Sequence, residues 1–118
     1  MEEHKDFWFQ KVVKVYVNAC IMPRGEGSYD TICIEVINFR KQEVLVEGVE
    51  YDGLPLLPEK NFYGRDIKMP HIIPGYDRWF IYLNAKTVEN FDPENLGVVC
   101  VTTKNGSKFR SEKITYGV

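Results

Sequence analysis

Apolar and polar residues alternate with a period of two through the middle of the chain. Ile32, Ile34 and Val36 alternate with Cys33 and Glu35. This period places alternate side chains on opposite faces of an extended strand, so we expect a strand with one buried face. The polar segment NFRKQ interrupts the pattern, which resumes in VLVEGVEYDG. The order predicts two strands joined by a turn.

Weaker versions of this pattern recur along the chain. A strand is predicted wherever β-branched and aromatic residues alternate between turn-forming residues. Short edge pieces are the most that the proline-rich connection between residues 54 and 75 can hold, because proline cannot donate a ladder hydrogen bond. The expected strands span residues 12–20, 31–38, 44–51, 78–84, 97–103 and 107–115, with edge pieces at 54–57 and 66–69.

Turn signals separate the expected strands. The segment from Pro23 to Ser28 is rich in glycine and predicts a loop. Asn105-Gly106 predicts a tight hairpin, because both residues tolerate positive φ. Residues 86–95 predict a short helical or 3₁₀ crossover, with an acid and a proline placed as at a helix start.

Three segments carry a resemblance to a known class of domains: EVIN (35–38), MPHIIPGY (69–76) and VTTKNGSKFRS (101–111). Together they are similar to small immunoglobulin-like and fibronectin-III-like domains of unassigned function from bacterial and phage genomes. The resemblance implies an all-β fold. The expected architecture is an immunoglobulin-like antiparallel β-sandwich of about seven strands, with a short helical turn before the penultimate strand. Residues 1–10 would be a lead-in, and residues 11–118 a single domain.

The alternation also bears on the cysteines. If the even-numbered residues of the 31–38 strand face inward, Cys33 faces outward with Glu35. A buried bridge from Cys33 to Cys100 between the sheets is then not expected. We expect all three cysteines to be reduced thiols.

Composition and charge narrow the function. The net charge is −2, and Glu112 interrupts the basic residues Lys104, Lys108, Arg110 and Lys113, so nucleic-acid binding is not expected. No apolar run approaches the roughly 18 residues of a membrane span. We expect a cytoplasmic protein, or one assembled into a virion if it derives from a phage.

The chain shows no constellation typical of catalysis. Two histidines and three dispersed cysteines do not provide a zinc site, and no cofactor motif is present. We therefore expect a non-enzymatic protein without a cofactor. A cysteine-dependent enzyme that uses Cys33 or Cys100 with His71 is a weaker hypothesis.

Aromatic residues concentrate in and beside the 54–75 connection. Phe80 and Tyr82 alternate with Trp79 and Ile81, so they should emerge on the opposite face of their strand. They could form an interaction surface, or the connection could fold over them as a satellite core. The candidate surface comprises Tyr51, Phe62, Tyr63, Arg65, Tyr76, Arg78, Phe80 and Tyr82.

The expected function follows from these residues. It is a protein-interaction or structural module that associates with itself or with a larger phage or prophage assembly. The alternative is a carbohydrate-binding domain that stacks sugars on Tyr63, Tyr76, Phe80 and Tyr82.

Overall fold

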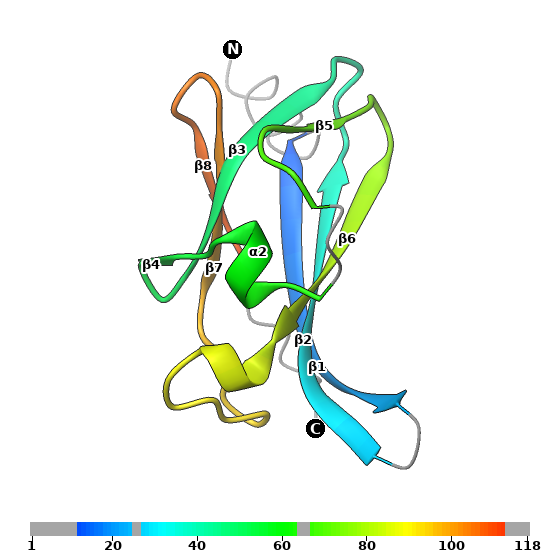
Figure 1. The fold of residues 1–118 in the computed structure, drawn as a ribbon. Helices are drawn as coiled ribbons and strands as arrows, with labels where there is room; N and C mark the ends of the chain where they lie inside the picture. Colours follow the sequence, from blue (N-terminus) through cyan, green and yellow to red (C-terminus); the bar gives the residue numbers. More distant parts are fainter. Residues whose placement is uncertain (1–11, 25–26, 64–66, 113–118) are drawn as a thin grey trace.

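A computed structural model describes residues 12–24, 27–63 and 67–112, and they form two antiparallel sheets packed face to face (Figure 1). Sheet A has the order β1-β2-β6 and sheet B the order β4-β3-β7-β8, with β5 paired to β3 beside β4. The expected all-β sandwich is confirmed. The strands are β1 (Val13–Arg24), β2 (Gly27–Asn38), β3 (Val44–Tyr51), β4 (Leu54–Pro55), β5 (His71–Ile73), β6 (Arg78–Asn84), β7 (Val99–Thr103) and β8 (Lys108–Arg110).

The core lies between the two sheets and is lined by the alternating residues of both. Ile32, Ile34 and Val36 of β2 are each 0% exposed, as the period of two predicted. Cys33 is half-buried on the outer face of sheet A, whereas Cys100 lies in β7 of sheet B. The prediction that Cys33 faces outward is confirmed.

A β-bulge in β3 changes which residues of that strand face the core. The register against β7 shifts between Val46 and Gly48. Val44 and Val46 are buried before the bulge, and Val49 and Tyr51 are buried after it. One extra residue therefore exchanges the faces of the second half of the strand.

The expected loop from Pro23 to Ser28 is strand in its described residues, so that prediction is wrong there; residues 25–26 lie outside the described ranges. β1 continues to Arg24 and β2 begins at Gly27, with Pro23 paired to Ser28. Proline is compatible with this position because it lies in an edge strand with no neighbour beyond β1 at that point in the described chain.

The proline-rich connection also differs from expectation. The first expected edge piece is β4, followed by a single helical turn, α2 (Pro58–Asn61). In place of the second expected edge piece, at 66–69, the strand β5 begins two residues after that range ends. The expected piece at 66–69 therefore has no strand in its described residues 67–69.

The crossover between β6 and β7 contains a 3₁₀ turn, which is one of the two expected forms. Only the 3₁₀ turn η1 (Ala85–Thr87) forms. The carboxylate of Asp92 accepts a hydrogen bond from Glu94 N at 3.0 Å, which closes a local turn and starts no helix. The final strand is β8, and residues 113–115 of its expected range lie outside the described residues.

Candidate functional site

The outer face of sheet A exposes aromatic side chains on β6. Ile81 and Leu83 point into the core and are at most 1% exposed. Phe80 and Tyr82 alternate with them and are 46% and 37% exposed. The prediction that these two rings leave the core is therefore confirmed, and the 54–75 connection does not bury them.

The strand register gives the rings defined neighbours on the same face. Phe80 pairs with Glu35 of β2, and Tyr82 pairs with Cys33. On the far strand of the sheet, Tyr16 is the partner of Glu35. We call the outward-facing set of Tyr16, Cys33, Glu35, Ile37, Phe80 and Tyr82 the aromatic face. Because it is carried by three paired strands, its geometry is fixed by the backbone ladder.

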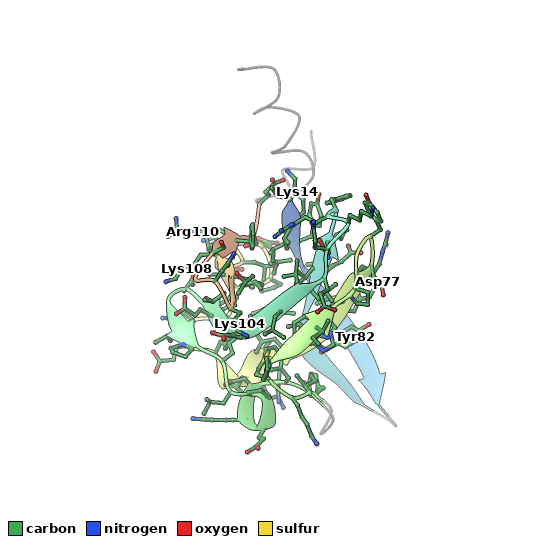
Figure 2. The ribbon with its side chains drawn as sticks, turned by 90° about the horizontal axis from the view of Figure 1, so that it is seen from above. Lys14, Asp77, Tyr82, Lys104, Lys108 and Arg110 are labelled. Carbon is green, nitrogen blue, oxygen red and sulfur yellow. The ribbon has the colours of Figure 1, made fainter. Side chains whose placement is uncertain are left out.

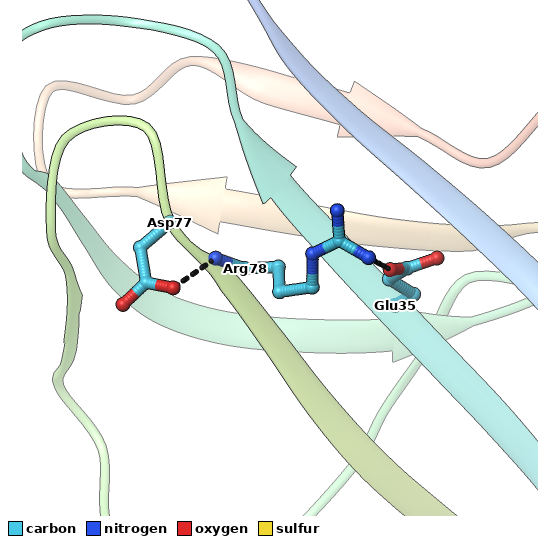
Figure 3. A network of polar contacts seen from close by, with 3 residues as sticks. All are labelled: Glu35, Asp77 and Arg78. Carbon is cyan, nitrogen blue, oxygen red and sulfur yellow. Dashed lines mark hydrogen bonds and ion pairs between the residues drawn. The ribbon is translucent and has the colours of Figure 1, made fainter.

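A charged pair lies on the aromatic face at the start of β6 (Figure 3). Arg78 Nη1 lies 3.1 Å from Glu35 Oε2, across the β2–β6 pair. The Asp77 carboxylate accepts a hydrogen bond from Arg78 N at 2.8 Å. Side-chain exposure of 59% for Arg78 means that this pair adds little stability, on the order of 0.2–1 kcal/mol. It leaves the guanidinium accessible beside the aromatic rings.

Two residues of the predicted surface belong to the core, so their assignment is wrong. Tyr51 is 5% exposed, and its hydroxyl accepts a hydrogen bond from Gly97 N at 2.8 Å. Phe62 is 6% exposed and forms an isolated bridge with Leu83 beside sheet A. The bulge in β3 turns Tyr51 inward. Phe62 is turned inward because the 54–75 connection returns toward β6 at this point.

The remaining predicted residues do not share one face. Tyr63 is half-buried, and its backbone N–H donates to the carbonyl of Tyr82 at 2.9 Å. Tyr76 is 69% exposed, but it lies in the turn before β6. Arg65 lies outside the described residues. The structure thus brings Arg78, Phe80 and Tyr82 together on β6 and places Tyr76 at the end of the sandwich.

A buried asparagine rigidifies that end and was missed by the sequence reasoning. Asn38 is 0% exposed, and its amide nitrogen donates to the carbonyls of Gln42 at 2.8 Å and Pro74 at 3.0 Å. Its amide oxygen accepts from Arg40 N at 2.9 Å. The side chain therefore joins the turn after β2 to the turn before β6. We call these two turns and Asn38 the asparagine clamp.

The clamp holds the two turns at backbone contact. Tyr76 N donates to the carbonyl of Arg40 at 3.0 Å. A Cβ atom on Gly75 would lie 2.0 Å from the carbonyl oxygen of Lys41, so only glycine fits there. Tyr76 has φ 57°, a conformation that favours glycine or asparagine. The only sequence signals for this arrangement were the asparagine at the strand end and the Pro74-Gly75 dipeptide.

Figure 2 shows Lys108 and Arg110 on the opposite side of the molecule from Tyr82 and Asp77, with Lys104 between the two sides. Lys104, Lys108 and Arg110 lie on the β7–β8 hairpin and are exposed. An open groove of about 440 Å³ lies between this hairpin and the turn after β2. It is lined by Arg40, Glu43, Val44, Leu45, Thr103, Lys104 and Asn105. Its mixed charges and open shape specify no ligand.

Cys33 lies in β2 of sheet A, whereas His71 and Cys100 lie in β5 and β7 of sheet B. Burial, with Cys20 and Glu35 nearby, raises the pKa of the Cys33 thiol, which disfavours the nucleophilic thiolate. His71 stacks on Trp79 with ring centroids 4.1 Å apart, and burial lowers its pKa. No group of three or more His, Cys, Asp or Glu residues in the described part of the chain could hold a metal ion.

Comparisons with protein-family models, with curated proteins and with solved structures gave no match for this chain. In the described ranges, no helix has the length and apolar character needed to cross a membrane. The arrangement of residues in the sandwich is therefore the basis for proposing a function.

Proposed function

We propose that this chain is a non-enzymatic interaction module that contacts a protein partner through the aromatic face of sheet A. The observation that carries the proposal is the exposure of Phe80 and Tyr82, 46% and 37%, at successive outward positions of β6. Aromatic side chains beside an arginine are enriched in protein interfaces, where they supply contact area at a small cost in conformational entropy. Arg78 occupies this position.

The order of the strands supports the immunoglobulin-like resemblance as part of this proposal. β1, β2 and β6 would correspond to strands A, B and E, and β3, β7 and β8 to strands C, F and G. Domains of this architecture host many functions, so the likeness gives no activity. The proposal extends to a structural role in a larger assembly, such as a phage or prophage particle, as the resemblance implies.

The test is to replace the two rings and measure partner capture. The double variant Phe80→Ser/Tyr82→Ser removes the exposed rings and leaves the inward residues of β6 unchanged. The matched control is Leu54→Ser/Leu57→Ser, because these residues are 58% and 56% exposed and lie outside sheet A. Immobilised wild type and control should retain the same proteins from a lysate of the source organism, as identified by mass spectrometry, and the ring variant should lose them.

Two outcomes count against the proposal. One is a reproducible set of bound proteins that the ring variant retains in full. The other is the absence of any protein that the wild type enriches over the ring variant. Before the capture experiment, circular dichroism must show that each variant is folded.

The alternative is that the same rings stack on a sugar. Phe80 and Tyr82 are exposed and lie two positions apart along a strand, so their rings are about 7 Å apart along its axis. A glycan array distinguishes the two functions. A hit that the ring variant loses would replace the protein partner by a carbohydrate.

A further inference from the structure

The two longest strands extend beyond the sandwich as a two-stranded arm (Figure 1). β6 ends where Asn84 pairs with Thr31, but β1 and β2 remain paired as far as Arg24 and Gly27. The arm therefore consists of Ile21–Arg24 and Gly27–Asp30. An isolated pair of strands is at best marginally stable in water, and a third strand stabilises it.

The direction of the backbone groups in β1 can be traced from the body of the sandwich. The carbonyl of Val15 accepts a hydrogen bond from Glu112 N at 3.2 Å, so it points away from β2. Backbone groups alternate in direction along a strand, and the β1–β2 register has no break. The backbone N–H and C=O of Ile21 and the carbonyl of Pro23 therefore also point away from β2, toward the outer edge of the arm.

The same reasoning applies to β2. Asn38 N donates to the carbonyl of Asp77 at 2.9 Å, so Asn38 points away from β1. By alternation, the N–H and C=O groups of Ser28 and Asp30 point the same way. β6 occupies this side from Thr31 onward, but no strand of the described chain lies beside Gly27–Asp30.

The two edges of the arm differ in their capacity to accept another strand. The β1 edge presents Pro23, which has no N–H to donate. The β2 edge presents a donor and an acceptor on each of Ser28 and Asp30. Proline is a common device by which proteins block one edge of a sheet. The arm is thus blocked on one side and open on the other.

Each of the other edges is covered or charged over part of its length. Glu112 N bonds to Val15 at the β1 edge, and Tyr63 N bonds to Tyr82 at the β6 edge. β4 and β5 cover the side of β3 away from β7. The short edge strand β8 exposes Lys108 and Arg110, and charges of this kind oppose edge pairing. The Gly27–Asp30 edge has no described strand paired to it and carries no lysine or arginine.

We propose that the Gly27–Asp30 edge pairs with the same edge of a second copy of this chain. The strands run antiparallel about a two-fold axis, so that Ser28 pairs with the partner's Asp30 and Asp30 pairs with the partner's Ser28. Each pair exchanges two backbone hydrogen bonds. The result is a four-stranded sheet in which both arms contribute.

The second copy is the occupant because the edge is self-complementary and the other edge is blocked. An antiparallel strand satisfies its outward groups when paired with its own two-fold mate. Pro23 then lies at both outer edges of the four-stranded sheet, so growth stops at a dimer. An arm with two open edges would instead allow open-ended assembly.

The dimer should be weak. The overlap is four residues per chain. The area that it buries is well below the roughly 800 Å² per partner of a standard stable interface. The inference rests on the proposed function in one respect, which is that the chain has an interaction role. It is otherwise independent, because the arm edge and the aromatic face are separate surfaces. We expect the mass from light scattering to rise from monomer toward dimer as the concentration approaches about 1 mM.

Replacing the outward N–H of Ser28 provides the test. Ser28→Pro removes a donor that the β1–β2 ladder does not use, whereas Ser28→Ala retains it. The proline variant should stay monomeric at about 1 mM, and the alanine variant should dimerise like wild type. Amide hydrogen exchange provides a second measurement that needs no variant. Protection of the Ser28 and Asp30 amides should increase with protein concentration, and that of Ile21 should not.

Pro23→Ala tests the blocked edge. It restores an N–H on the β1 side, so species larger than a dimer should appear. A wild type that is monomeric at about 1 mM, or a dimer that Ser28→Pro retains, would overturn the proposal. Phe80→Ser/Tyr82→Ser should leave the dimer intact, so loss of partner capture and loss of the dimer are distinguishable outcomes.

Discussion

At one end of sheet A, the asparagine clamp ties the turn after β2 to the turn before β6, whereas at the other end β1 and β2 continue as an arm with one open edge. At the clamp, the amide oxygen and nitrogen of one buried side chain satisfy backbone groups from two turns. At the arm, the outward groups of Ser28 and Asp30 have no strand beside them in the described chain. From this comparison we expect that the asparagine clamp contributes more to folding stability than the arm does. We expect the arm to be the end that associates with another chain.

The largest effect should come from opening the clamp with Asn38→Ala. The substitution leaves Arg40 N and the carbonyls of Gln42 and Pro74 without their buried partner. Unsatisfied buried groups cost about 1–3 kcal/mol each, so we expect a loss of about 4 kcal/mol. Urea unfolding with an unchanged m-value measures it.

The control for this substitution is Asn95→Ala, at an exposed position. It should stay within about 0.5 kcal/mol of wild type. A loss below about 1 kcal/mol for Asn38→Ala would show that stability is not concentrated at the clamp.

A somewhat smaller loss is expected from Gly75→Ala. The new Cβ would lie 2.0 Å from the Lys41 carbonyl oxygen and 2.8 Å from its carbon, so the two turns must separate. Overpacking of this kind costs about 3 kcal/mol. Gly48→Ala is the matched control, because nothing lies within 4 Å of its Cβ position. Thermal and urea unfolding should separate the two variants, and equal losses would contradict the contact between the turns.

Local pattern and tertiary contact contributed differently to what could be predicted. The alternation in β2 and β6 correctly placed Ile32 and Ile81 inside and Phe80 and Tyr82 outside, because a strand with one buried face imposes a period of two. A strict period counted from Val44 would place Tyr51 outside. The bulge between Val46 and Gly48 reverses that parity, and strict alternation does not predict it.

The clamp and the arm could not be predicted for a different reason. Asn38 bonds to the carbonyl of a residue 36 positions away, and such a contact leaves no periodic signal. Pro23 and its neighbouring glycines indicated a loop, but the edge location of β1 makes proline compatible with the strand. The two features that distinguish the ends of sheet A therefore both depend on tertiary context.

A small gain in stability is expected from Tyr76→Gly. Tyr76 is 69% exposed and occupies a turn position with φ 57°, where a side chain other than glycine is strained. Glycine should relieve about 1 kcal/mol of this strain. Tyr82→Gly, at an ordinary strand position, should lose a similar amount. Differential scanning calorimetry gives the signs. A destabilised Tyr76→Gly would mean that the ring supports the clamp.

The smallest effect concerns the pH dependence of the clamped end. His71 lies on β5, just before the Ile73 and Pro74 carbonyls that Asn38 binds, and its ring stacks on Trp79 at 4.1 Å. Burial lowers the pKa of His71, because the charged imidazolium loses hydration in the folded state. The unfolded chain then binds the proton more readily than the folded chain does.

The stability from neutral His71 is therefore complete above its unfolded pKa of about 6.5, and it is lost as the pH falls through the lower folded pKa. Urea midpoints between about pH 7.5 and pH 5 should fall more steeply for wild type than for His71→Gln. Taking the difference between the two proteins removes the contribution of carboxylates, which titrate in both. The prediction is contradicted if the difference in urea midpoint between the two proteins is constant with pH, or if it grows in favour of wild type on acidification. Either result would show that burial of the His71 ring does not contribute pH-dependent stability at this end.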